Sequence, residues 1–261
     1  MKKMILKVLI IATVTMGLAG CGSAGTSKSK DSNKKFTKTY VISTDATYAP
    51  FEYEKDGKYI GIDIDLLASI AKLEGFKYEL KAMDFKGIIP ALQANQIDAA
   101  IAGMGITDVR KKVLDMSDGY FESGLSAVGK KGNDKIKSEA DFKGKIFAVK
   151  KGTLGAKYAE DNKDKLGASV KYFNDTASMM QEVKNGNADV TFEDYPVIAY
   201  MISVDPNSNL QIIGNKLTTQ NYGFAVKKGS NTELITAFND GLKKLKANGE
   251  YDKIVQKYIK K

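Results

Sequence analysis

Two segments of this chain share one layout, and that repetition limits the possible folds more than any other feature. In residues 92–100 and again in residues 183–191, a helix end is followed by an Asn-containing turn and then by an Asp one residue into a strand. The first copy continues to Gly103, and the second continues to Glu193 and Asp194. Two similar units that each place polar groups at a strand end indicate two lobes with a cleft between them.

Apolar strands alternate with amphipathic helices along the chain, which is typical of an α/β protein whose mainly parallel sheets are flanked by helices. Pro90 falls in one of these helices, where it is compatible only with the first turn. Ligands of such sheets bind at the carboxyl ends of the strands. We expect strands at 40–44, 76–82, 145–149 and 222–226, and helical spacing of apolar residues after Gly61, after Asp84, at 235–245 and at 251–258.

The stretch from residue 97 to residue 110 joins a strand to a helix through two glycines. Its apolar run breaks at Gly103 and Gly105 and restarts as a helix capped by Thr107, with Arg110 three residues past the cap. Open peptide groups at the strand end, the N–H groups of the helix start and a nearby cation all favour an anion. This stretch therefore predicts a place for a small molecule that carries a carboxylate.

The composition excludes several kinds of chemistry. The chain has 261 residues with no histidine, no tryptophan and a single cysteine, Cys21. Intrachain disulfides, histidine acid–base catalysis and Cys/His zinc sites are therefore excluded. No acidic run has the spacing of a calcium loop. We expect no metal, no cofactor and no enzymatic activity.

The formal charge of +9 is concentrated at the N-terminus. Residues 1–20 hold three lysines and no acid, and residues 22–39 hold five lysines against Asp31, so the remainder carries only +2. Because the basic charge belongs to a tail, nucleic acid is not an expected partner. An anionic membrane surface near that tail is the more natural one.

The first 20 residues have the layout of a secretory signal peptide, with Lys2 and Lys3 ahead of an apolar run. The run ends in Leu-Ala-Gly before Cys21, which resembles the lipobox of bacterial lipoproteins. That resemblance implies cleavage before Cys21 and lipid, such as palmitate, on its sulfur. The alternative is a signal peptide with an incidental cysteine. We expect residues 21–38 to be the lipidated cysteine and a flexible tether rich in Ser, Gly and Lys.

From Tyr40 to Lys261 the chain resembles the extracellular solute-binding proteins that feed polar amino acids to ABC importers, and the glutamine binders among them in particular. The family implies a periplasmic-binding-protein-like fold of type II, in which two lobes on a two-strand hinge close over one amino acid. The segments that carry the resemblance are Asp45-Ala-Thr-Tyr-Ala-Pro-Phe-Glu52, Gly61-Ile-Asp-Ile-Asp-Leu66, Gly87-Ile-Ile-Pro-Ala-Leu92, Thr107-Asp-Val-Arg-Lys111 with Ser117-Asp118, and Asn248-Gly-Glu-Tyr251.

The resemblance also implies the organisation and the partners of the chain. Lobe 1 is expected to comprise 39–122 and 221–261, lobe 2 to comprise 125–217, and the hinge to lie near 120–126 and 215–222. The partners would be a free amino acid and a membrane permease with its ATPase. The protein would be a monomer held by Cys21 on the extracellular face of the cell membrane, as suits a Gram-positive bacterium.

Site residues follow from the resemblance position by position. Arg110 would clamp the ligand α-carboxylate, aided by peptide N–H groups around Thr153 and Leu154. Asp194 would bind the α-ammonium, aided by the Gly103 carbonyl. Tyr48 and Phe85 would enclose the aliphatic part of the side chain, with ordinary core packing as the alternative. The expected ligand-binding residues are Asp45, Tyr48, Phe85, Ala102, Gly103, Gly105, Arg110, Lys150, Thr153, Leu154, Glu193 and Asp194.

The side-chain end of the pocket determines the substrate. Asp45 and Lys150 stand where glutamine-binding relatives hold the ligand amide. Glu193 departs from the pattern, because the glutamine relative has a histidine there, and an acid at that position disfavours a ligand carboxylate. Gly105 also departs, because relatives carry a hydroxyl there. Glutamine therefore ranks first, glutamate or another polar amino acid second, and arginine or lysine third.

Two other functions stay open at this point. One is a dehydratase on the same scaffold, in which Lys150 and Glu193 would form an acid–base pair. The other is a sensory or adhesive lipoprotein that uses the same clamp.

Overall fold

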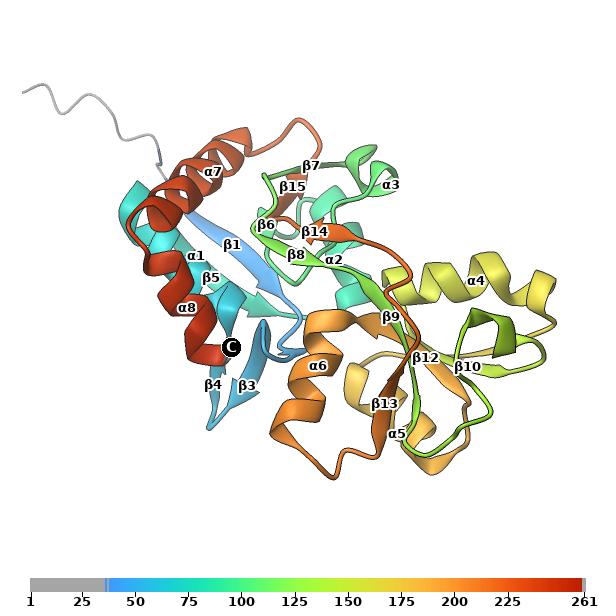
Figure 1. The fold of residues 1–261 in the computed structure, drawn as a ribbon. Helices are drawn as coiled ribbons and strands as arrows, with labels where there is room; N and C mark the ends of the chain where they lie inside the picture. Colours follow the sequence, from blue (N-terminus) through green and yellow to red (C-terminus); the bar gives the residue numbers. More distant parts are fainter. Residues whose placement is uncertain (1–35, 37, 260–261) are drawn as a thin grey trace, which may run out of the picture. The chain divides into compact units, whose positions relative to one another are not determined.

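Two five-stranded sheets, together with the helices that flank them, make up most of the regular structure in the computed structural model (Figure 1). The structure describes residue 36 and residues 38–259. The expected signal peptide, Cys21 and most of the expected tether lie outside these residues.

The first sheet has the order β5-β1-β6-β15-β7, and only β15 runs against the direction of its neighbours. A small three-stranded sheet, β2-β3-β4, precedes α1. The strands are β1 (Thr39–Thr44), β2 (Thr47–Tyr48), β3 (Glu52–Lys55), β4 (Lys58–Ile60), β5 (Lys77–Ala82), β6 (Ala99–Ala100), β7 (Leu114–Met116) and β15 (Ala225–Lys227), and the helices are α1 (Ile62–Glu74), α2 (Phe85–Gln93), α3 (Asp108–Lys111), α7 (Thr232–Ala247) and α8 (Glu250–Tyr258).

The second sheet repeats this arrangement in the order β11-β10-β12-β9-β13, with β9 as the one reversed strand. Both sheets are therefore mixed and mainly parallel, as the alternation of strands and helices predicts. The strands are β9 (Leu125–Lys130), β10 (Ile146–Lys150), β11 (Ser169–Phe173), β12 (Val190–Asp194) and β13 (Leu210–Ile213), and the helices are α4 (Leu154–Leu166), α5 (Thr176–Asn185), α6 (Tyr195–Val204) and a 3-10 turn at Glu139–Phe142.

The repeated Asp of the two similar segments has the same structural role in both sheets. Asp98 precedes β6, and its carboxylate accepts a hydrogen bond from the Val41 backbone N–H at 2.9 Å. Asp189 precedes β12, and its carboxylate accepts from the Ile146 N–H at 2.8 Å. Each Asp lies one residue before its strand rather than one residue into it. The first carboxylate ties the start of β6 to β1 and the second ties the start of β12 to β10, which fixes the register of each parallel pair.

A short strand pair carries the chain between the two sheets. Strand β8 (Phe121–Ser123) leads from the first sheet to the second, and β14 (Gln220–Tyr222) leads back, and the two strands pair with each other (Figure 1). We propose this pair as the hinge near 120–126 and 215–222, with 39–122 and 221–261 forming lobe 1 and 125–217 forming lobe 2.

The strand expected at 222–226 is in fact two strands. Tyr222 pairs with Phe121 in the crossing pair, whereas Ala225 pairs with Ala100 in the first sheet. Gly223 lies between them and donates its N–H to the Met104 carbonyl at 3.0 Å. The apolar run is continuous in sequence, but its two halves have different partners.

Two other expectations need correction. Pro90 is the sixth residue of α2 and not part of its first turn, so the helix lacks the hydrogen bond that a residue there would donate to the Lys86 carbonyl. The flexible tether does not extend over Phe36 and Lys38. Phe36 packs against Phe76 with ring centres 5.5 Å apart, and Lys38 pairs with Asp98 at 2.6 Å.

Gly61 sets the entry to α1 through a close backbone approach. Its φ is +135°, and a Cβ at this position would overlap the Phe51 carbonyl. The next two residues donate backbone N–H groups back to this segment, from Ile62 to the Pro50 carbonyl at 3.0 Å and from Asp63 to the Phe51 carbonyl at 2.9 Å. Gly61 thus holds the start of α1 against β3.

The substitution Gly61→Ala is expected to lower the free energy of unfolding by about 3 kcal/mol, because it adds a steric overlap to an unfavourable φ. Gly57→Ala is the matched control, since Gly57 also has a positive φ but no atom within 4 Å of the added Cβ; it should cost about 1 kcal/mol. Urea unfolding measures both. Equal losses in the two variants would show that the approach to Phe51 is unimportant.

Candidate ligand-binding site

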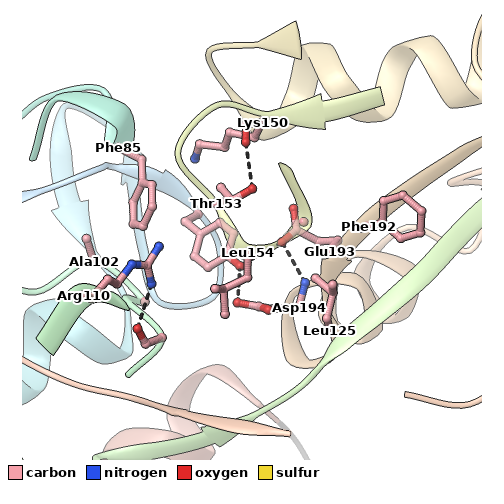
Figure 2. A pocket seen from close by; sticks show the side chains of 14 residues that line it. Phe85, Ala102, Arg110, Leu125, Lys150, Thr153, Leu154, Phe192, Glu193 and Asp194 are labelled. Carbon is pink, nitrogen blue, oxygen red and sulfur yellow. Dashed lines mark hydrogen bonds between the residues drawn. The ribbon is translucent and has the colours of Figure 1, made fainter. Parts of the chain in front are cut away.

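A small cavity that is partly open to solvent lies between residues of the two proposed lobes. Figure 2 shows Phe85, Ala102 and Arg110 on one side and Glu193, Asp194 and Leu125 on the other. Of the twelve expected ligand-binding residues, all but Asp45 line it. The lining is Tyr48, Phe85, Ala102, Gly103, Gly105, Arg110, Leu125, Lys150, Thr153, Leu154, Gly155, Phe192, Glu193 and Asp194.

Arg110 is a buried cation held in place by backbone carbonyl groups. It lies in the single turn of α3, where Thr107 caps the helix by accepting the Arg110 N–H at 3.2 Å. Its guanidinium donates to the Gly105 carbonyl at 2.8 Å and to the Gly152 carbonyl, on the second sheet's side, at 3.1 Å. Burial lowers the pKa of Arg110 to about 10, and Asp194 opposes this shift. The group therefore stays protonated at neutral pH with N–H donors left to offer a carboxylate.

Asp194 is a buried acid at the opposite wall, at the end of β12. It accepts hydrogen bonds from Tyr222 at 2.6 Å, from Tyr48 at 2.9 Å and from the Gln220 amide at 3.1 Å. Burial raises the pKa of Asp194, while these donors and the Arg110 charge oppose the rise. The surroundings are those of an anion prepared for a cationic partner.

Glu193 precedes Asp194 and accepts the Asp194 backbone N–H at 2.8 Å. Burial raises the pKa of Glu193 to about 7, and the adjacent Asp194 charge adds to the rise. The Tyr48 hydroxyl lies 2.8 Å from Glu193 and 2.9 Å from Asp194. A phenol has one hydrogen to donate, so both contacts are hydrogen bonds only when one of the two carboxyl groups is protonated. Glu193, whose pKa is raised to about 7, holds that proton in part of the molecules at neutral pH.

Tyr48 therefore has a more polar role than the expected enclosure of an aliphatic chain. Its hydroxyl lies on the two acids, and its ring stands against Gly103, whose added Cβ would come within 2.8 Å of the ring. Gly103 has a φ of +52°. The ring and the positive φ together explain why this position is a glycine.

Lys150 and Asp45 form a buried ion pair, with side chains 2% and 3% exposed. Asp45 lies behind Lys150 and does not line the cavity. The Lys150 ammonium is 5.8 Å from the centre of the Phe85 ring, and the Arg110 guanidinium is 5.5 Å from the same ring. Phe85 thus contacts both cations through its π-system.

Gly105 packs closely against groups on both sides of the site. A Cβ at this position would lie 2.8 Å from the end of the Leu154 side chain and 3.5 Å from the Arg110 guanidinium. Leu154 begins α4, which Thr153 caps by accepting the Ala156 N–H at 3.1 Å. A side chain at position 105 would therefore require the end of the Leu154 side chain to move.

Five residues of the site were not anticipated from the sequence. Leu125, Gly155 and Phe192 line the cavity, and Gln220 and Tyr222 donate to Asp194. Gln220 and Tyr222 fall in the segment expected to cross between the lobes, and their polar atoms were the available signal. The three lining residues have the appearance of core residues and carry no such signal.

The described residues contain no group of three or more Cys, Asp or Glu side chains able to hold a metal ion. No helix in the same part of the chain is long and apolar enough to cross a membrane.

Comparison with known proteins places this geometry in a family. Residues 40–261 match the bacterial extracellular solute-binding proteins, family 3. The chain belongs to this family. It is 33% identical to the arginine-binding extracellular protein ArtP of Bacillus subtilis (strain 168) over 260 residues, which cover 99% of this chain and 98% of ArtP. It is 37% identical to the ABC transporter glutamine-binding protein GlnH of the same strain over 275 residues, covering 100% and 98%.

A solved structure of an ancestral arginine-binding protein bound to arginine is 43% identical to this solute-binding protein, with a TM-score of 0.80. The match covers 85% of this chain and 98% of the ancestral one. The expected family and its two-lobe α/β fold are thereby confirmed.

The raised pKa of Glu193 predicts a pH dependence for this solute-binding protein. The group titrates near 4.5 when unfolded and about 7 when folded, so the folded state binds more protons between these values. Its contribution to stability is complete below pH 4.5 and is lost as pH rises through 7. Relative to the wild type, Glu193→Gln should gain stability over this range, by up to about 3 kcal/mol.

Urea unfolding at a series of pH values from 4 to 8 measures this gain. Glu79→Gln, which removes the same charge from an exposed strand position, is the control. Parallel curves for the wild type and Glu193→Gln would contradict a raised pKa at Glu193.

Proposed function

We propose that this chain is the substrate-binding lipoprotein of an ABC importer, and that it captures a polar amino acid, with glutamine favoured, between two closing lobes. The arrangement of Arg110 and Asp194 carries the proposal. A buried guanidinium and a buried carboxylate face one cavity from the two sheets. Unlike charges on facing walls suit the α-carboxylate and α-ammonium of a free amino acid. The relatives, one named for binding arginine and one for glutamine, support the substrate class.

Closure follows from the same contacts. Arg110 donates to Gly152, and Tyr48 contacts Glu193 and Asp194, so groups of the proposed lobe 1 already bond to groups of lobe 2. An amino acid that bridges Arg110 and Asp194 adds to these bonds only when the lobes are together. Ligand binding therefore shifts the population toward the closed form, which we propose the permease recognises.

Replacing Arg110 with Ala should weaken glutamine binding at least about 30-fold, because truncating one partner of a buried charge pair costs about 2–5 kcal/mol. Isothermal titration calorimetry measures the affinity. Lys111→Ala is the matched control, since Lys111 is the neighbouring exposed cation of α3. Unchanged glutamine affinity in Arg110→Ala would remove Arg110 from the site.

Charge balance favours glutamine over arginine as the ligand. Arg110 and Asp194 are matched by the two ends of an amino acid, and Lys150 is neutralised by Asp45. Glu193 is then the one remaining acid, and its raised pKa leaves it partly protonated at neutral pH. An uncharged amide side chain fits this balance, with the Lys150 ammonium as donor to its carbonyl. A cationic side chain needs an ionised Glu193 and must approach the Lys150 charge.

Lys150→Leu should reverse this preference, because it removes the repelling cation and leaves the Asp45 carboxylate without its partner. We expect the ratio of glutamine to arginine affinity to fall at least about tenfold, equivalent to about 1.4 kcal/mol. Calorimetric titration with each amino acid gives the ratio, and Lys151→Leu, an exposed neighbour, is the control. A ratio equal to that of the wild type would show that Lys150 does not select the ligand.

The lipid anchor at Cys21, the extracellular face of the cell membrane and the monomeric state belong to the same proposal. Its support is the sequence Leu-Ala-Gly-Cys at residues 18–21 and membership of an extracellular family.

A further inference from the structure

Glu52 and Asp63 are two acids buried directly behind the ligand-binding site. Both are 0% exposed, and neither lines the cavity. Glu52 begins β3, and Asp63 is the second residue of α1. The close approach at Gly61 brings these segments together, since the Asp63 N–H bonds to the carbonyl of Phe51, the residue before Glu52. The two carboxyl groups lie within hydrogen-bonding reach of each other.

One oxygen of Asp63 is fully used. Asp63 Oδ2 accepts the Gly103 backbone N–H at 2.8 Å and the Tyr120 hydroxyl at 2.8 Å. Within the described residues, by contrast, no N–H or hydroxyl group of another residue donates to Asp63 Oδ1 or to either oxygen of Glu52. Ionised carboxylates can only accept, so two charged groups here would leave three buried oxygens unsatisfied and would repel each other.

A single proton removes the repulsion and pairs two of the three oxygens. We infer that Glu52 and Asp63 share one proton, with the Glu52 hydroxyl donating to Asp63 Oδ1, and that the pair positions the peptide between Ala102 and Gly103 at the ligand site. The proton turns a pair of repelling acceptors into a donor and an acceptor. It leaves the Asp63 carboxylate charged, and therefore a strong acceptor for the Gly103 N–H.

The surrounding charges agree with this assignment. Burial raises the pKa of Glu52 well above its ordinary value, Asp63 and Asp45 raise it further, and Lys150 opposes them. Burial also raises the pKa of Asp63, to about 6, against the bonds from Gly103 and Tyr120. The other titratable groups that face the pair are the phenols of Tyr120 and Tyr251, which are neutral.

The consequence for the site is positional. Ala102 and Gly103 both line the cavity, and the peptide that joins them is fixed through its N–H by Asp63. Since the N–H and C=O of a trans peptide point in opposite directions, this bond also sets the direction of the Ala102 carbonyl. Asp63 is a positioning residue with no ligand contact of its own, and this part of the inference rests on the proposed function.

The variant Glu52→Gln tests the shared proton, because the amide keeps the shape and the donor but cannot ionise. The infrared difference spectrum of wild type minus Glu52→Gln at pH 7 should contain the C=O band of a protonated carboxyl group. Glu79→Gln, which removes an exposed carboxyl, should give a carboxylate band instead. A carboxylate band for Glu52→Gln would overturn the shared proton.

Stability against pH gives a second reading without ligand. A proton held by the folded pair makes wild-type stability fall as pH rises above the ordinary Glu value of 4.5. The unfolding equilibrium constant of the wild type relative to Glu52→Gln should rise by up to tenfold per pH unit above that value. Parallel profiles would overturn the shared proton.

The positioning role is tested by a rescue pair at Asp63. Asp63→Leu removes the acceptor for Gly103 and should weaken glutamine binding at least tenfold. Asp63→Asn keeps one oxygen for Gly103 and Tyr120 and turns an N–H₂ toward Glu52, so it should recover most of the affinity. Equal affinity in folded Asp63→Leu and the wild type would overturn the role.

Hydrogen exchange of the Gly103 amide in the wild type decides the case if Asp63→Leu does not fold. Slow exchange is expected from the bond to Asp63, and exchange as fast as in an open loop would overturn it. If the wild type binds no amino acid, the proposed function fails, while the infrared spectrum, the pH profile and the amide exchange still decide the inference.

Discussion

Burial of unlike charges at facing strand ends is the constraint on which the rest of this structure depends. Arg110 and Asp194 are both removed from water, and neither is satisfied by a direct ion pair with the other. Each is held instead by neutral partners, carbonyl groups for Arg110 and hydroxyl and amide donors for Asp194. The charge on each wall is therefore not neutralised by an opposite charge of the protein, and a zwitterionic ligand can pair with both.

The scaffold achieves this by using one construction twice. Asp98 before β6 and Asp189 before β12 each tie their strand to its parallel neighbour, and each strand leads into the site. The first copy ends in glycines that expose peptide groups, and the second ends in two acids. A common framework thus supplies complementary chemistry to the two walls of one cavity, and the charge difference lies entirely in the residues that follow the repeat.

Local signals made much of this predictable. The cap at Thr107 and the two acids at the end of β12 depend on adjacent residues, so the sequence predicts them well. Contacts between distant segments are different. Nothing near Tyr48 in the sequence shows that its hydroxyl reaches Glu193, and nothing near Gly105 shows that Leu154 fills the space beside it. Such contacts depend on how the two sheets face each other, and a single sequence does not state that arrangement.

Strand β14 combines two tasks. It returns the chain from one sheet to the other, and two of its side chains, Gln220 and Tyr222, donate to Asp194. The same strand therefore connects the two sheets and stabilises the Asp194 carboxylate. If this strand bends as the proposed hinge, the donors around Asp194 would shift, and the pKa of Asp194 would then depend on the angle between the lobes.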